Sequence, residues 1–169
     1  MVHPLVEQLR FTRSEWIRGL KDVTAEEAAR RFEPINPIAW MVGHLAWQEQ
    51  RYWLQAAQGI TLVEAVMACG FGQPASNPPL AEMWDAWHSI TQAADNHLDT
   101  LTSEMLTQHY VVNGRTVPES PGTLLRRTTY HYWYHLGEAS AVRQLLGHKD
   151  LPWFVGDIGV EAPYRPETE

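Results

Sequence analysis

The sequence contains a single cysteine, Cys69, so no disulfide can form within the chain and a reducing compartment suits it best. It also lacks an apolar run of membrane-spanning length, and its first residues, MVHPLVEQLRF, do not have the pattern of a signal peptide. We therefore expect a cytoplasmic protein without a membrane segment. Within AVMACGFG, Cys69 fits a small, half-buried residue better than a reactive nucleophile.

Positive charge is scarce as well. The 169 residues include 13 Lys and Arg against 20 Asp and Glu, which gives a formal net charge of −7. A nucleic-acid-binding surface needs an excess of basic side chains, so this balance argues against a nucleic-acid partner and leaves small-molecule substrates open. The chain also has no repeat and no low-complexity tract, and its length predicts a single domain over residues 1–169.

Helix-forming sequence, by contrast, is plentiful. Apolar residues make up 44% of the chain and charged residues 20%, as in ordinary globular proteins, and eight residues are tryptophan. Four segments repeat their apolar residues at the three- and four-residue intervals of a helix face. They predict long helices over residues 2–20, 37–58, 80–106 and 121–147. Asn36 before Pro37, and Ser120 before Pro121, predict N-caps followed by a proline in the first helical position.

Long connections separate these helices. Residues 59–79 combine Gly, Pro, Ser and Asn and predict a loop with one short helix, whereas the Asn-Gly pair within residues 106–120 predicts a small hairpin. The Gly- and Pro-rich tail predicts irregular coil held by four apolar anchors: Trp153, Phe154, Val155 and Ile158. Together these features predict an all-α fold, an antiparallel four-helix bundle with long inter-helix loops and an irregular C-terminal tail.

Two histidines lie four residues apart in TYHYWYHLGEASAVRQLLGH, inside the last predicted helix. Positions i and i+4 point the same way, so His131 and His135 can reach one metal ion. The alternative is a pair of core histidines hydrogen-bonded to their neighbours. Tyr132 follows His131 where a zinc protease needs glutamate, which excludes that mechanism. The inward stripe that we expect for this helix comprises Leu124, Thr128, His131, His135, Glu138, Val142 and Leu145.

A third histidine, His44, lies in PIAWMVGHLAWQEQRYW beside Gly43, whose missing side chain allows close helix approach. It could complete a site of three nitrogens, and three protein ligands leave a coordination position open, as in catalytic metal sites. We expect the remaining histidines to lie at the surface or outside the ligand shell: His3, His88, His97, His109 and His148.

The segments GHLAWQEQRYW around His44 and RTTYHYWYHLGEASAVRQLLG around His131 and His135 resemble the DinB-like (YfiT-like) family of four-helix-bundle proteins, and the likeness covers nearly the whole chain. The resemblance implies that these three histidines bind a divalent metal such as Zn, Ni or Mn. It also implies thiol chemistry, because the family includes bacillithiol S-transferases and mycothiol-dependent maleylpyruvate isomerase. By this likeness, the chain would activate the thiol of a low-molecular-weight cosubstrate for transfer to a small electrophile.

The sequence is equally compatible with two other functions: a metal-dependent hydrolase, and a non-catalytic stress-response protein that binds metal or ligand. Glu138, one turn beyond His135, could orient an imidazole or act as a catalytic base, or it could pair with Arg143 or face solvent. Arg127 could hold the carboxylate of an anionic cosubstrate, or form a surface ion pair. The many tryptophans could supply an external apolar face, so we expect a homodimer.

Overall fold

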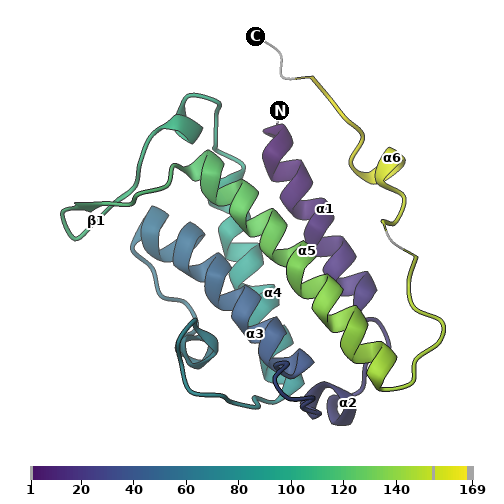
Figure 1. The fold of residues 1–169 in the computed structure, drawn as a ribbon. Coiled ribbons are helices and arrows are strands. Elements are labelled where there is room, and N and C mark those ends of the chain that lie inside the picture. The colour runs from purple at the N-terminus through teal and green to yellow at the C-terminus, as the bar shows by residue number, and fades with distance from the viewer. Residues whose placement is uncertain (1, 154, 167–169) are drawn as a thin grey trace.

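The computed structural model describes residues 2–153 and 155–166 and shows an all-α chain (Figure 1). The long helical elements are α1 (Pro4–Gly19), α3 (Ile38–Glu49), its π-helical continuation η1 (Gln50–Ala56), α4 (Leu80–Leu98) and α5 (Pro121–Leu145). The short ones are α2 (Ala25–Ala29), η2 (Glu64–Cys69), η3 (Met105–Thr107) and α6 (Ile158–Glu161). The predicted short helix in the first long connection is η2. In the second connection, β1 (Val111–Val112) and β2 (Arg115–Thr116) form the predicted hairpin.

Local sequence explains several boundaries. The hydroxyl of Ser120 accepts a hydrogen bond from the Thr123 amide and Pro121 opens α5, as predicted. The prediction of Asn36 as an N-cap is wrong by one residue. Pro37 itself is the N-cap, with φ −61° and ψ 149°, and no side chain caps α3. Proline fixes φ but leaves ψ free to be extended, so it fits outside the helix as well as in its first turn.

The third predicted helix, 80–106, is also too long, because α4 ends at Leu98. Beyond that point the hydroxyl of Thr100 donates to the carbonyl of His97. In a continuing helix this carbonyl would accept a backbone N–H instead. The chain then turns and buries Leu101 and Leu106 against the core. Both leucines are therefore buried although the helix has ended.

The long helices form two parallel pairs that run in opposite directions (Figure 1). In the pair α1 and α5, Phe11 contacts Trp133 in the middle, and Arg143 donates to the carbonyl of Gly19 near both C-terminal ends. In the pair α3 and α4, Gly43 packs against Met83 near both N-terminal ends. Helices of different pairs therefore run antiparallel, whereas the two helices within each pair run parallel. The connection over residues 59–79 is long enough to return the chain along α3 before α4 begins.

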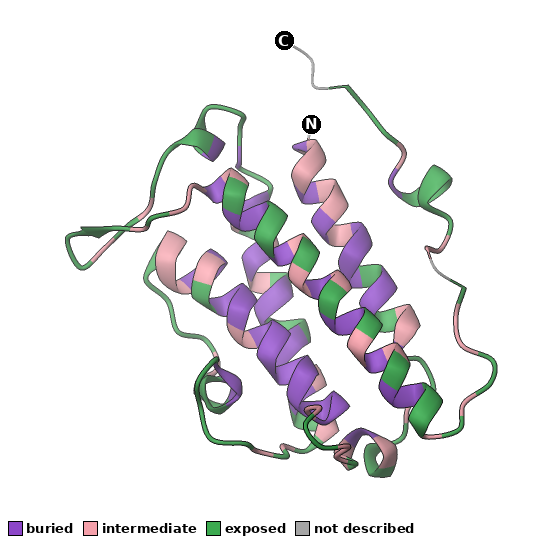
Figure 2. Ribbon diagram, viewed as in Figure 1, coloured by how far each residue is buried: buried purple, intermediate pink, exposed green. Residues whose placement is uncertain are grey.

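The buried faces of the long helices form the core (Figure 2). This core is rich in aromatic residues. Trp16, Trp53 and Tyr132 are the largest fully buried side chains. The predicted inward stripe of α5 needs correction, because Leu145 is 57% exposed whereas residues outside the stripe, namely Tyr132, Leu125 and Ala139, are fully buried. The hydroxyl of Tyr132 has polar partners inside the core, which allows a tyrosine to occupy that position.

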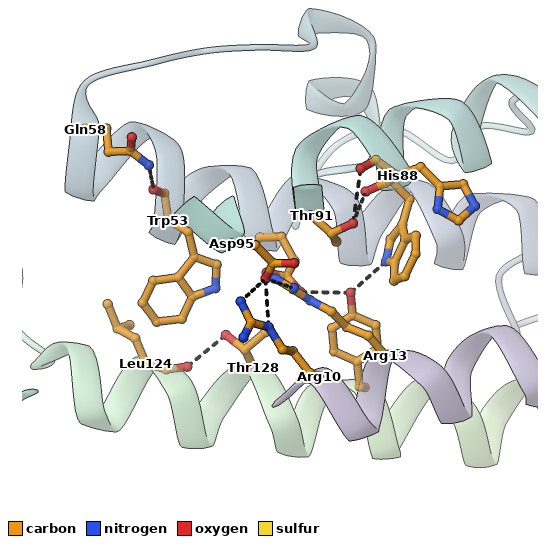
Figure 3. A network of polar contacts seen from close by, with 12 residues as sticks. Arg10, Arg13, Trp53, Gln58, His88, Thr91, Asp95, Leu124 and Thr128 are labelled. Atoms are coloured by element: carbon orange, nitrogen blue, oxygen red, sulfur yellow. Dashed lines mark hydrogen bonds and ion pairs between the residues drawn. The ribbon is translucent and has the colours of Figure 1, made fainter. Parts of the chain in front are cut away.

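A buried ionic network links the long helices. The guanidinium of Arg13, on α1, donates to both carboxylate oxygens of Glu49, on α3, at 2.7 Å each. Tyr132, on α5, donates to Glu49 at 3.0 Å and accepts from the Trp87 indole, on α4, at 2.7 Å. Figure 3 shows Arg13 also reaching Asp95 of α4, at 2.8 Å. Each buried charge therefore has a charged or hydrogen-bonded partner, as burial requires.

The C-terminal tail packs differently from the prediction. Trp153 is 84% exposed and Ile158 is also exposed, so neither is an anchor, and Phe154 lies outside the described residues. Polar contacts hold the tail along α1: Glu15 accepts from the Gly156 amide, and Gln8 donates to the carbonyl of Ala162. None of the helices in the described part of the chain has the length and apolar character needed to cross a membrane.

Candidate metal centre

The structure brings together the three histidines that the sequence singled out. His44 comes from α3, and His131 and His135 come from successive turns of α5. One ring nitrogen from each lies within 4.8 Å of the other two. The Nε2 atoms of His131 and His135 are 3.0 Å apart. Nitrogens bound at about 2.1 Å to one tetrahedral ion lie about 3.4 Å apart, so the two nitrogens of α5 need little movement to share an ion.

Oxygen acceptors orient two of the three imidazoles. The Nδ1 of His44 lies 2.6 Å from the carbonyl oxygen of Cys69, and the Nδ1 of His135 lies 2.7 Å from Oε2 of Glu138. A carbonyl or carboxylate oxygen can only accept, so each Nδ1 carries the proton and each Nε2 keeps a lone pair for the cluster. This is the usual environment of a metal-binding histidine. The Nδ1 of His131 is buried and has no hydrogen-bond partner among the described residues.

Packing around His44 explains how its ring is held. The rings of Trp40 and Trp47, one turn before and after it, stack on His44 with centroids 4.5 and 5.2 Å away. Gly43 makes room for η2, because a Cβ at this position would lie 2.6 Å from the sulfur of Cys69. The absent side chain thus allows the Cys69 carbonyl to reach His44. As predicted, the glycine permits close approach. The elements that approach α3 at this point are η2 and α4.

The electrostatic environment keeps two of the three imidazoles, those of His44 and His131, uncharged at neutral pH. Burial lowers the pKa of His44 to about 4, an effect that the Cys69 carbonyl partly offsets. Burial, followed by the neighbouring His135 and His44, lowers the pKa of His131 to about 3. A neutral imidazole has the free lone pair that a metal ligand requires.

The cluster lies beside a cleft of about 760 Å³, and His44 and His131 form part of its lining. The other lining residues are mainly aromatic or cationic: Trp47, Tyr52, Phe71, Tyr130, Tyr134, Arg51, Arg126 and Arg127. The consecutive aromatic residues of α5 divide between environments, as the helical geometry predicts. Tyr130 and Tyr134 face this cleft, whereas Tyr132 lies in the core. The arrangement can admit a small molecule to the histidine nitrogens.

The other two predicted site residues are also close to the cluster. Glu138 contacts His135 and not Arg143, whose guanidinium donates to the Gly19 carbonyl and to His148. Arg127 lines the cleft and forms an ion pair with Glu119, so both readings of this residue have a structural basis.

The remaining histidines are engaged elsewhere. His3 caps α1, His97 contacts Tyr110, His109 contacts the Val117 carbonyl, His148 contacts Glu27 and His88 stacks on Trp84. Sequence reasoning missed the Cys69 carbonyl and the cleft residues Arg51 and Glu119. Arg51 had a detectable signal, since it follows His44 by seven residues on the same helical face. The sequence gives no signal for the Cys69 carbonyl, because every residue has a backbone carbonyl.

Comparison with known protein families gives one match. The sequence profile of the DinB superfamily matches residues 8–139, a span that includes all three clustered histidines. A search of curated proteins found no match to the chain. The donor set also suits a first-row divalent metal, because such ions prefer neutral imidazole nitrogens. Since the profile covers most of the chain, this protein belongs to the DinB superfamily.

Proposed function

We propose that His44, His131 and His135 bind a divalent metal ion and that the protein is a thiol-dependent S-transferase acting on a small electrophile. The observation that carries the proposal is the convergence of three imidazole nitrogens within 4.8 Å beside an open cleft. Three protein ligands leave room for an exchangeable fourth, which is typical of catalytic sites. The metal would be Zn, Ni or Mn, all of which accept imidazole ligands.

The residues around the cluster would have distinct roles. The three histidines would hold the metal, which would supply the positive charge that lowers the pKa of a bound thiol. The Cys69 carbonyl would hold the His44 tautomer, and Glu138 would hold that of His135. Glu138 lies at Nδ1 of His135, and its contact with that imidazole favours an orienting role over that of a catalytic base.

The thiol would come from a cosubstrate. The sulfur of Cys69 is buried 3.9 Å from Met83, and burial raises its pKa to about 11. It is therefore a poor nucleophile at neutral pH. A low-molecular-weight thiol and a small electrophile would enter through the cleft, whose volume is in the range of small-molecule sites.

Further expectations belong to the same proposal. The chain would be a single domain over residues 1–169, its long helices would form the bundle of the DinB type, and it would act in the cytoplasm as a homodimer. Exposed apolar side chains such as Phe71 and Trp153 would be available for dimer contacts. Light scattering at several protein concentrations tests the oligomeric state.

A metal analysis of untagged protein, followed by a panel of thiols with a common electrophile, tests the proposal. We expect about one metal ion per chain and conjugation that requires a particular thiol. Hydrolysis of esters or amides without thiol would instead identify a hydrolase, in which the metal activates water. Metal binding without either activity would identify a non-catalytic binding protein. Protein that binds no metal would overturn all three readings.

A further inference from the structure

A carboxylate of the protein itself occupies the cationic side of the cleft. Glu119 lies directly before the N-cap of α5, and its side chain faces Arg127 two turns into that helix. The Nε of Arg127 lies 2.8 Å from one carboxylate oxygen and 3.1 Å from the other, and Nη2 also contacts the carboxylate. Both residues line the cleft that contains His44 and His131.

A second cation lines the same cleft as this carboxylate. Arg51, on η1, lies over the rings of Trp47 and Tyr52, with its guanidinium carbon 5.4 and 5.7 Å from their centroids. It makes no ion pair with any carboxylate in the described part of the chain. The hydrogen bond from Arg127, with a smaller electrostatic contribution from Arg51, lowers the pKa of Glu119. Glu119 is therefore held by one arginine and attracted by another.

The charge of this cleft is opposite to that of the whole chain. Its lining includes three arginines, the third being Arg126, and one acidic residue, Glu119, although the chain carries a net charge of −7. Planar guanidinium groups match carboxylates in shape and hydrogen bonding. A cationic, aromatic cleft beside three histidines therefore suits a small acid with a flat apolar part.

We infer that Arg51 and Arg127 form a carboxylate-binding subsite beside the histidine cluster, and that Glu119 occupies this subsite until the carboxylate of a ligand displaces it. The inference rests on the proposed function in one respect only: a ligand held in this subsite would place its reacting group at the metal. The ligand class is a small organic acid, either the electrophile or the thiol cosubstrate.

The exchange of Glu119 for a ligand carboxylate would have a low cost. The side chains of Arg127 and Glu119 are 52% and 30% exposed, and ion pairs of this kind contribute little to stability. Glu119 lies in the irregular connection between the hairpin and α5, so its side chain can swing out without breaking a helix. An incoming acid that also contacts the aromatic walls would gain apolar burial that Glu119 does not have.

Calorimetric titration of metal-free protein with benzoate at low ionic strength tests the inference, with benzamide as the uncharged isostere. Removal of the metal prevents the carboxylate from binding there instead. We expect Glu119→Gln to bind benzoate about two- to fivefold more tightly than the parent. Arg127→Gln and Arg51→Gln should each bind it severalfold more weakly, while benzamide binding stays unchanged in all variants. Glu104→Gln and Arg30→Gln, which alter charges outside the cleft, serve as matched controls.

The two possible roles of Glu119 predict different changes in benzoate affinity when this residue is replaced. If Glu119 only positions Arg127, its replacement will weaken benzoate binding or leave it unchanged, and the inference fails. It also fails if neither the parent nor Glu119→Gln binds benzoate, or if benzoate and benzamide respond alike. A separate zinc titration of the same proteins distinguishes this failure from failure of the metal site, because the subsite variants retain all three histidines.

Discussion

The ring of His44 on α3 is hydrogen-bonded to the backbone carbonyl of Cys69, with Nδ1 and O 2.6 Å apart. This contact ties the connection between η1 and α4 to the candidate metal centre. It also gives Cys69 a role that belongs to its backbone and not to its thiol.

Replacement of His135 by alanine should abolish stoichiometric metal binding while the protein stays folded. Two nitrogens would remain, whereas the packing of the four long helices does not depend on this imidazole. Metal content by mass spectrometry and helicity by circular dichroism provide the measurement. His88→Ala, a histidine on α4 outside the cluster, should retain its metal. Full metal occupancy in His135→Ala would end the three-histidine hypothesis.

Glu138→Gln should weaken zinc binding by about 10- to 100-fold, because loss of an orienting carboxylate has effects of this size at histidine metal sites. Competition with a chelator of known affinity measures the change. Glu82→Gln, at an exposed position of α4, is the control and should match the parent. An unchanged zinc affinity in Glu138→Gln would show that the contact with His135 does not matter for binding.

Two glycine substitutions should have opposite effects. Gly43→Ala places a Cβ 2.5 Å from the sulfur of Met83 and 2.6 Å from that of Cys69, so it should destabilise the fold by about 1–3 kcal/mol and weaken metal binding through the displaced η2. Gly137→Ala meets no atom within 4 Å on α5 and should stabilise the protein by about 0.5–1 kcal/mol. Urea unfolding measures both. Equal effects would contradict the close packing at Gly43.

Arg13→Met should destabilise the protein by roughly 3–5 kcal/mol, because it leaves the carboxylate of Glu49 buried without its cation. Arg10→Met removes a cation from the partly exposed pairs with Asp95 and Asp99, so its effect should stay below about 1 kcal/mol. Urea unfolding of both variants at neutral pH gives the comparison. Similar losses in the free energy of unfolding for the two variants would show that the buried pair stabilises the protein no more than the partly exposed pairs do.

The thiol of Cys69 should react slowly with a disulfide reagent in the native state. Burial raises its pKa from 9.0 to about 11, so at pH 8 about one thiol in a thousand is ionised, against about one in ten without the shift. Because the raised pKa favours the protonated form, labelling should accelerate about tenfold per pH unit as the pH rises toward 11. Unfolding in concentrated urea should give immediate labelling. Rapid labelling of folded protein at pH 8 would contradict this account.

The sequence by itself determined features that depend on neighbours along the chain. Ser120 and Pro121 start α5, Asn113 and Gly114 adopt the positive φ of the hairpin turn, and the spacing of His131 and His135 puts both on one face. Each follows from the conformational preference or the helical period of a few adjacent residues. The same local preferences did not place the end of α4, which lies at Leu98 and not at residue 106.

Only the tertiary structure decided which segments meet. Local periodicity allows either direction for neighbouring helices, and packing across long connections selected two parallel pairs. That choice brings α3 against α5, so His44 reaches His131 and His135, and it lets the Cys69 carbonyl approach through the gap at Gly43. It also put Glu119 on Arg127 inside the cleft, although the sequence left the partner of that arginine open. Contacts between residues far apart in sequence depend on the free energy of the whole packed core, which no short stretch of sequence encodes.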